Sequence, residues 1–154
     1  MARWSEVERA APDLAARARA LFDAKTHKTL ATLRKDGSPR ISGIELEFRD
    51  GDVWFGSMWQ AVKALDLQRD PRYAIHSGSD DPDDWNGDAK IAGRAEEMTD
   101  PEFVAEMNTE APPGPSHRFR LDVTEVSVVA LDEPRKHLVI ESWHEGRGVT
   151  KLQR

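Results

Sequence analysis

The sequence predicts a mainly β fold, a small antiparallel barrel of Greek-key or meander type with about six or seven strands and two or three peripheral helices. Three observations support this prediction. Runs rich in β-forming residues are separated by tight-turn pairs such as Asp36-Gly37 and Asp50-Gly51. Most connections between these runs are short, which favours antiparallel pairing over βαβ crossovers. Only 38% of the 154 residues are hydrophobic, so a narrow barrel, or a core completed by a partner subunit, suits the composition.

Composition also limits the classes of function that the chain can serve. The net charge of −6 argues against a general nucleic-acid binder or a protein of anionic membranes, although a single cleft can still be basic. The chain has no cysteine, which excludes disulfides, thiol catalysis and cysteine metal sites. We see neither a secretory signal nor an apolar run of roughly 18 residues. We therefore expect one cytoplasmic domain, residues 1–154, without nucleic-acid or membrane partners.

Residues 1–26 are expected to be helical. Ser5 and Glu8 have the spacing of a capping box, and Pro12 separates this segment from a second helix over Pro12–Asp23. In the second helix, apolar residues recur at helical spacing and predict a packing face. The members of this face are Leu14, Ala18, Leu21 and Phe22.

Residues 27–143 are expected to form the barrel, beginning with a strand from Lys28. The run after Asp36-Gly37 alternates in polarity, with Glu45 and Glu47 on one face, which predicts a single half-buried antiparallel strand. This strand and its neighbours on either side of the two Asp-Gly turns are expected to form a three-stranded meander. The residues on the opposite face of the strand from the glutamates are Ser42, Ile44, Leu46 and Phe48.

The rest of the chain alternates between strands, short helices and loops. The loop Gly78–Asp88 holds several aspartates, but their spacing differs from that of an EF-hand, so we expect a solvated loop rather than a calcium site. Helices are expected from about Gln60 to Asp70-Pro71 and over Asp100–Met107. Strands are expected over Val53–Met58, Arg72–Ser77, Ala89–Met98, Phe119–Leu131 and His137–Trp143, followed by a C-terminal tail at 144–154.

The stretch Ser57–Lys63 lies where a strand is followed directly by a helix. The first backbone N–H groups of a helix are unpaired, and together with the helix dipole they favour an anion such as phosphate. Ser57 can add a hydroxyl, Gln60 an amide and Lys63 a positive charge. Gly56 would let a flat ring approach the strand backbone closely. Short helices with one lysine are common, so an ordinary surface lysine is the alternative.

Several aromatic and histidine residues could serve packing or a site. Trp54 is interpreted as a core residue, whereas Trp59 either shields a bound ring or anchors the helix. His76 is expected to satisfy a local hydrogen bond rather than act as an acid or base. His137 and His144 lack the spacing of a zincin motif and fall on opposite faces of an extended segment, so we expect no metal site.

The order of these elements resembles the pyridoxamine 5′-phosphate oxidase-like superfamily, whose members have the FMN-binding split-barrel fold. The resemblance covers roughly Ala24 to Leu131 and rests on the ordered spacing of three segments, "DGSPRIS", "VWFGSM" and "VKALDLQRDPR". It implies a six- to seven-stranded antiparallel split β-barrel of Greek-key type. It also implies a homodimer with the cofactor cleft at its interface, where Trp143 could reach the partner's cleft.

The resemblance assigns positions around the phosphate of the cofactor. Arg40, Ile41 and Ser42 would line the ribityl-phosphate region, and Lys63 would bind the phosphate. Val62 stands where the oxidases proper often carry arginine, so one charge partner of the phosphate is missing. The C-terminal segment "ESWHEGRG" does not match the arginine-histidine substrate element of those oxidases.

The implied function is an FMN-binding oxidoreductase that carries out hydride transfer on an unidentified small molecule. An F420-dependent reductase, a non-catalytic flavin or tetrapyrrole binder, and a structural domain with an empty cleft are the alternatives. No catalytic residue is assigned, because the cofactor supplies the chemistry of hydride transfer. Ser57 and Met58 would border the isoalloxazine ring. The residues expected to bind the cofactor are Arg40, Ile41, Ser42, Gly56, Ser57, Met58, Gln60 and Lys63.

Overall fold

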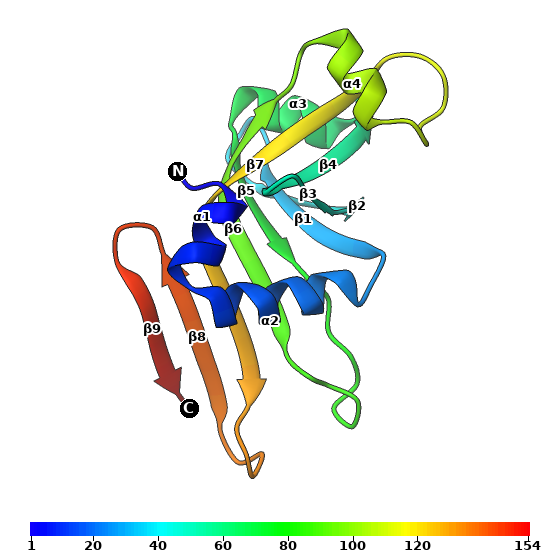
Figure 1. The fold of residues 1–154 in the computed structure, drawn as a ribbon. Helices are drawn as coiled ribbons and strands as arrows, with labels where there is room; N and C mark the ends of the chain where they lie inside the picture. The colour runs from blue at the N-terminus through cyan, green and yellow to red at the C-terminus, as the bar shows by residue number, and fades with distance from the viewer.

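The computed structural model describes residues 1–154, and its mainly β architecture confirms the predicted fold class (Figure 1). All strand pairs are antiparallel, in the order β2-β1-β5-β6-β7-β4-β3, and β8 and β9 extend the sheet beside β7. The helices are α1 (Trp4–Ala10), α2 (Pro12–Asp23), α3 (Val62–Arg69) and α4 (Pro101–Met107). The strands are β1 (His27–Leu33), β2 (Pro39–Glu45), β3 (Glu47–Arg49), β4 (Asp52–Met58), β5 (Arg72–His76), β6 (Asp88–Glu97), β7 (Ser116–Leu131), β8 (Leu138–His144) and β9 (Gly148–Gln153).

The strand predicted across Ser42–Phe48 is interrupted at Leu46, and its two parts lie at opposite ends of the sheet. Its first part, β2, pairs only with β1, whereas its second part, β3, pairs only with β4. The predicted three-stranded meander is therefore wrong: β2 and β4 touch, but no hydrogen-bonded ladder joins them. The two ends of the sheet are thus the two halves of one predicted strand, and no ladder joins them.

Both Asp-Gly turns form where the sequence predicts them. Gly37 and Gly51 adopt φ values of 85° and 78°, which glycine accepts without a steric penalty. In the first turn the Asp36 carboxylate accepts hydrogen bonds from the backbone and the hydroxyl of Ser38 at 2.9 and 2.6 Å. This turn fixes the register of β1 against β2.

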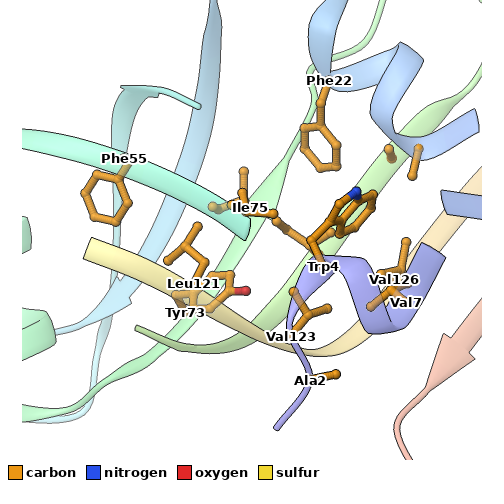
Figure 2. Close-up of a cluster of buried hydrophobic side chains, with 14 of the residues drawn as sticks. Ala2, Trp4, Val7, Phe22, Phe55, Tyr73, Ile75, Leu121, Val123 and Val126 are labelled. Atoms are coloured by element: carbon orange, nitrogen blue, oxygen red, sulfur yellow. The ribbon is translucent and has the colours of Figure 1, made fainter. Parts of the chain in front are cut away.

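The N-terminal helices cover one face of the sheet. α2 packs against β6, β7 and β8 with Leu14, Ala18 and Phe22 buried, as its apolar stripe predicts. Trp4 of α1 lies edge-on to Phe48, with ring centroids 5.0 Å apart. Figure 2 shows Trp4 and Phe22 meeting the strand side chains in one core. None of the helices has the length and hydrophobicity needed to cross a membrane.

A register shift between Ala92 and Gly93 of β6 leaves Thr124 as an extra residue in the facing strand β7, which bends there. A Cβ atom on Gly93 would lie 1.9 Å from the carbonyl oxygen of Asp122, so no other residue fits there without displacing the backbone. The bulge lies between the part of the 16-residue strand β7 that pairs with β4 and the part that pairs with β8.

The C-terminal segment 144–154, predicted as a tail, contains β9, which pairs with β8 as a hairpin. This extra strand and the interruption at Leu46 explain why the structure has nine strands rather than the expected six or seven. Trp143 on β8 is 6% exposed and belongs to the core. The expectation that Trp143 reaches into a partner's cleft is therefore wrong.

Candidate functional site

The turn between β4 and α3 presents unpaired backbone amides, as the sequence predicted. β4 ends at Met58, and Gln60 takes the left-handed conformation with φ 60°. Ala61 occupies the N-cap position of α3, and no side chain caps this helix. The N–H of Ala64 bonds to the Ala61 carbonyl, whereas the N–H groups of Val62 and Lys63 have no acceptor in the chain. Two donors at the positive end of the helix dipole are therefore available to an anion.

A buried histidine supports this turn. His117, the second residue of β7, is 1% exposed, and its Nε2 accepts a hydrogen bond from the backbone N–H of Gln60 at 3.1 Å. Its Nδ1 lies 2.5 Å from a carboxylate oxygen of Glu97. The indole of Trp59 stacks on the imidazole with the ring centroids 4.8 Å apart. His117 was not predicted as a site residue, because the sequence places it in the connection before the strand expected from Phe119.

A basic groove of about 480 Å³ lies between the β1–β2 hairpin and α3. At its base, Asp66 is 3% exposed and is surrounded by donors. Arg40 Nε donates to Asp66 at 2.7 Å, the Thr32 hydroxyl donates at 2.8 Å, and Arg69 donates at 3.1 Å. The groove is lined by Arg34, Lys35, Asp36, Arg40, Val62, Leu65, Asp66 and Arg69.

The hydrogen bonds around Asp66 keep its carboxylate ionised. Burial alone would raise the pKa of Asp66, but the hydrogen bonds from Arg40, Thr32 and Arg69 outweigh burial and leave the pKa below its ordinary value. Because Arg40 uses Nε for this pair, its two Nη nitrogens make no hydrogen bond within the chain. Arg40 therefore contributes the outer edge of its guanidinium, with free donors, to the groove.

The structure brings only some of the predicted cofactor residues together. Arg40 lines the groove, and Val62 lines it too, at the position where the oxidases proper often carry arginine. Lys63 is adjacent on α3 but does not line the groove; it is half-buried and has no hydrogen-bond or ion-pair partner. Ile41 and Ser42 point to opposite faces of β2, with Ile41 74% exposed and Ser42 half-buried.

The predicted ring-binding residues of β4 are likewise divided between its two faces. Ser57 is buried, and its hydroxyl donates a long bond of 3.4 Å to the Met58 carbonyl. Met58 is 76% exposed, and Gly56 shares its face of the strand. A Cβ atom on Gly56 would lie 3.2 Å from the side-chain oxygen of Asn108, so a polar group borders this side. A planar group reaching Gly56 or Met58 would not touch the Ser57 side chain.

Three basic groove residues were missed in the sequence: Arg34, Lys35 and Arg69. Arg34 and Lys35 precede the Asp36-Gly37 turn, and Arg69 follows Val62 by two helical turns, on the same face of α3. A helical-face argument from Val62 would have identified Arg69, whereas the proximity of the hairpin is a tertiary feature.

A second hollow, of about 330 Å³, lies on the outer face of the sheet. The strand register places Ile41, Ala31, Ala74, Ala92 and Glu125 in one row across five strands. The adjacent row includes Thr29, His76 and Lys90. The small alanine side chains leave a shallow, mostly apolar surface there.

Other residues singled out in the sequence serve local structure. His76 accepts the Gly78 N–H at 2.9 Å, the local hydrogen bond that the sequence predicted, and Trp54 is buried as expected. His137 pairs with Asp132 at 3.0 Å and His144 with Glu125 at 3.6 Å. We find no group of three or more histidine and carboxylate side chains arranged to hold a metal ion.

Comparisons with known proteins place this geometry in a family. The model of a family described as pyridoxamine 5′-phosphate oxidase matches residues 14–130. A comparison with curated proteins found no match. Among solved structures, PhzG from Burkholderia lata 383, in complex with tetrahydrophenazine-1-carboxylic acid, superposes with a TM-score of 0.63. It is 17% identical, over 93% of this chain and 91% of that chain.

Two further solved structures share the fold. A pyridoxamine 5′-phosphate oxidase-related, FMN binding protein from Nostoc punctiforme PCC 73102 gives a TM-score of 0.60 at 14% identity, over 96% of each chain. A protein described as an F420 reductase gives 0.55 at 21% identity, over 71% of this chain and 94% of that chain. At these identities the structural likeness establishes the split-barrel fold alone.

Proposed function

The chain belongs to the pyridoxamine 5′-phosphate oxidase family, and from this premise we propose that it binds FMN and carries out hydride transfer on a small molecule. The observation that supports the proposal most is the pairing of the basic groove with the uncapped start of α3. The groove and the start of α3 both present hydrogen-bond donors without partners, on the same short helix and its neighbouring hairpin. These donors gather at one place although the net charge of the chain is −6. Such a local concentration of donors fits a phosphate.

The residues present fit the phosphate of FMN. The amides of Val62 and Lys63 and the Nη nitrogens of Arg40 are donors without partners in the chain. Lys63 would add a charge from the same turn, as the family resemblance implies. The arginine missing at Val62 is compensated by other cations of the groove, since Arg34 and Arg69 also line it.

The remaining predicted residues would orient the rest of the cofactor. FMN, when bound, supplies a ring that accepts or donates hydride. Met58 and Trp59 are 76% and 54% exposed and would provide apolar surface beside such a ring, and Gly56 would allow its close approach. The protein would bind and orient the cofactor and would exclude water from it. None of its side chains would need to transfer a proton. We therefore assign no catalytic residue.

We also propose that two copies associate through the outer face of the sheet. Ile41 is 74% exposed there, beside the row of alanines that leaves the 330 Å³ hollow. The same face carries Lys90 and Glu125, opposite charges that suit pairing with a second copy of itself. Covering this face would bury apolar area that the single chain leaves exposed. Ile41 would then lie at the interface while its neighbour Arg40 holds the phosphate.

A second candidate, an F420-dependent reductase, is favoured by the number of cations in the groove. Four basic residues line it against two carboxylates, and hydrogen bonds within the chain already engage both carboxylates. The surplus of two positive charges suits either one doubly charged phosphate or the separate single charges of a cofactor with several anionic groups. A non-catalytic flavin or tetrapyrrole binder is the third candidate.

Retention of cofactor by purified protein separates these functions. We expect the protein, after incubation with FMN or F420 and gel filtration, to keep a flavin or deazaflavin absorption band in stoichiometric amount. Bleaching of a retained FMN band by NAD(P)H under anaerobic conditions would support an oxidoreductase. Retention without reduction by any hydride donor would favour a binding protein, and retention of neither cofactor would contradict the proposal.

A further inference from the structure

We propose that His117 is a positioning residue for the phosphate end of the cofactor. By accepting the Gln60 N–H, it holds the β4–α3 turn in the conformation that leaves the amides of Val62 and Lys63 open to an anion. This inference rests on the proposed function, because it assumes that the anion at this turn belongs to a flavin cofactor. His117 itself is buried and would not touch the cofactor.

The hydrogen bonds determine the form of the imidazole. Nε2 accepts the backbone N–H of Gln60, so this nitrogen carries no proton. Nδ1 faces the carboxylate of Glu97 and must therefore be the protonated nitrogen. The ring is thus the neutral tautomer with its proton on Nδ1, and the hydrogen bond from Nδ1 to the carboxylate of Glu97 fixes its orientation. Only this form can hold the turn.

Glu97 extends the same support to the body of α3. Its second carboxylate oxygen accepts a hydrogen bond from the side-chain amide of Gln68 at 2.8 Å. One carboxylate on β6 therefore reaches the turn before α3 through His117 and the last turn of α3 through Gln68. Both ends of this eight-residue helix are fixed to the barrel by one connected network.

The turn needs such support because of its backbone. Gln60 has φ 60°, a conformation that is unfavourable for residues other than glycine. The imidazole acceptor and the stacking of Trp59 on the same ring oppose relaxation of this residue toward the ordinary region. If the turn relaxed, the N–H groups of Val62 and Lys63 would rotate away from a common anion.

Two substitutions separate positioning from packing. His117→Gln keeps a neutral acceptor near the position of Nε2, whereas His117→Leu keeps volume without an acceptor. We expect His117→Leu to weaken FMN binding at least tenfold and riboflavin binding, which lacks the phosphate, less than threefold. We expect His117→Gln to bind FMN within threefold of the wild type. Equal losses for FMN and riboflavin, or a glutamine variant no better than leucine, would overturn the inference.

Amide hydrogen exchange of the cofactor-free wild type tests the same idea without any variant or ligand. We expect the Gln60 amide to exchange at least a hundredfold more slowly than the Val62 and Lys63 amides, because only Gln60 has an acceptor. Rapid exchange at Gln60 would overturn the role of His117 even if FMN binds. If the Gln60 amide exchanges slowly but the protein binds no FMN, the proposed function would be contradicted. The role of His117 in holding the β4–α3 turn would still stand.

Discussion

Arg40 on β2 and Asp66 on α3 are joined by a 2.7 Å hydrogen bond between Nε and a carboxylate oxygen. The pair connects the edge strand of the split barrel to the helix that follows β4, across a stretch where no ladder joins the two hairpins. Since Arg40 donates to Asp66 through Nε, its two Nη nitrogens are available to an anion in the groove. The same contact thus connects β2 to α3 and orients one guanidinium of the candidate site toward the groove.

Removing the carboxylate of Asp66 should destabilise the fold. Asp66→Ala leaves the Thr32 hydroxyl and the Arg40 guanidinium without their partner. Arg69 would keep only its hydrogen bond to the Leu33 carbonyl, and we expect a loss of about 2–3 kcal/mol in the free energy of unfolding. This lies below the cost of breaking a fully buried pair, because Arg40 and Arg69 are 25% and 38% exposed. Urea denaturation measures the change. Asp23→Ala, at an exposed i,i+4 pair with Arg19, is the control and should lose at most about 0.5 kcal/mol.

The bulge glycine should be irreplaceable. Gly93→Ala would place a methyl group 1.9 Å from the Asp122 carbonyl oxygen, so the β6–β7 ladder would have to shift. We expect either no folded protein or a loss of more than about 3 kcal/mol. Gly43→Ala is the matched control in β2, where a Cβ atom meets nothing within 4 Å. Similar thermal midpoints for the two variants would contradict the register shift described here.

The turn before β8 should make stability depend on acidic pH. Hydrogen bonds from the backbone and the ring of His137 lower the pKa of Asp132 from 3.8 to about 2. Because the folded pKa is the lower one, this carboxylate stabilises the fold above pH 4, and its contribution is lost as the pH falls from about 4 to about 2. We expect Asp132→Asn to lower the thermal midpoint at pH 6 and to match the wild type near pH 2. A difference that persists at pH 2 would argue against this assignment.

Lys63 should matter for the cofactor and not for the fold. Its ammonium has no partner within the chain, so Lys63→Ala should leave the melting temperature of the cofactor-free protein unchanged. We expect FMN affinity to fall at least tenfold, about 1.4 kcal/mol. Lys151→Ala on the exposed strand β9 is the control for loss of one positive charge. Fluorescence quenching of FMN measures the affinity of each variant. Equal affinities for the two variants would remove Lys63 from the site.

Local patterns identified most of the elements correctly. The Asp-Gly pairs specify their own turns, because glycine supplies the positive φ that they need. The stripe of α2 predicts its buried face, since side chains three and four apart share one side of a helix. The strand, turn and helix around Ser57–Lys63 also form where the change in hydrophobic period predicts them.

The interruption at Leu46 could not be predicted from the same patterns. Alternation continues through Ser42, Ile44, Leu46 and Phe48, so nothing local shows that the two halves pair with different strands. β9 was missed for a related reason: all six of its residues are exposed, and only pairing with β8 makes it a strand. Both errors concern which strand is the neighbour, which depends on contacts distant in the sequence.

The candidate site was predicted only in part, because several of its contacts join residues that are distant in the sequence. Unpaired helix amides after β4 follow from the chain order alone, and Arg40 was identified by the family resemblance. The partner of Arg40, Asp66, is 26 residues away, and His117 is 57 residues from the Gln60 amide that it holds. Side-chain hydrogen bonds over such separations leave no periodic signal in the sequence.

We propose that donors at the edge of β2 and at the start of α3 hold the phosphate of a flavin nucleotide. The most direct measurement is the dissociation constant of the wild type for FMN and for riboflavin, by fluorescence quenching in one buffer, repeated with Arg40→Gln. We predict that the wild type binds FMN at least tenfold more tightly than riboflavin, and that Arg40→Gln abolishes most of this preference. Equal affinity of the wild type for the two flavins, or a preference that survives the substitution, would contradict the account.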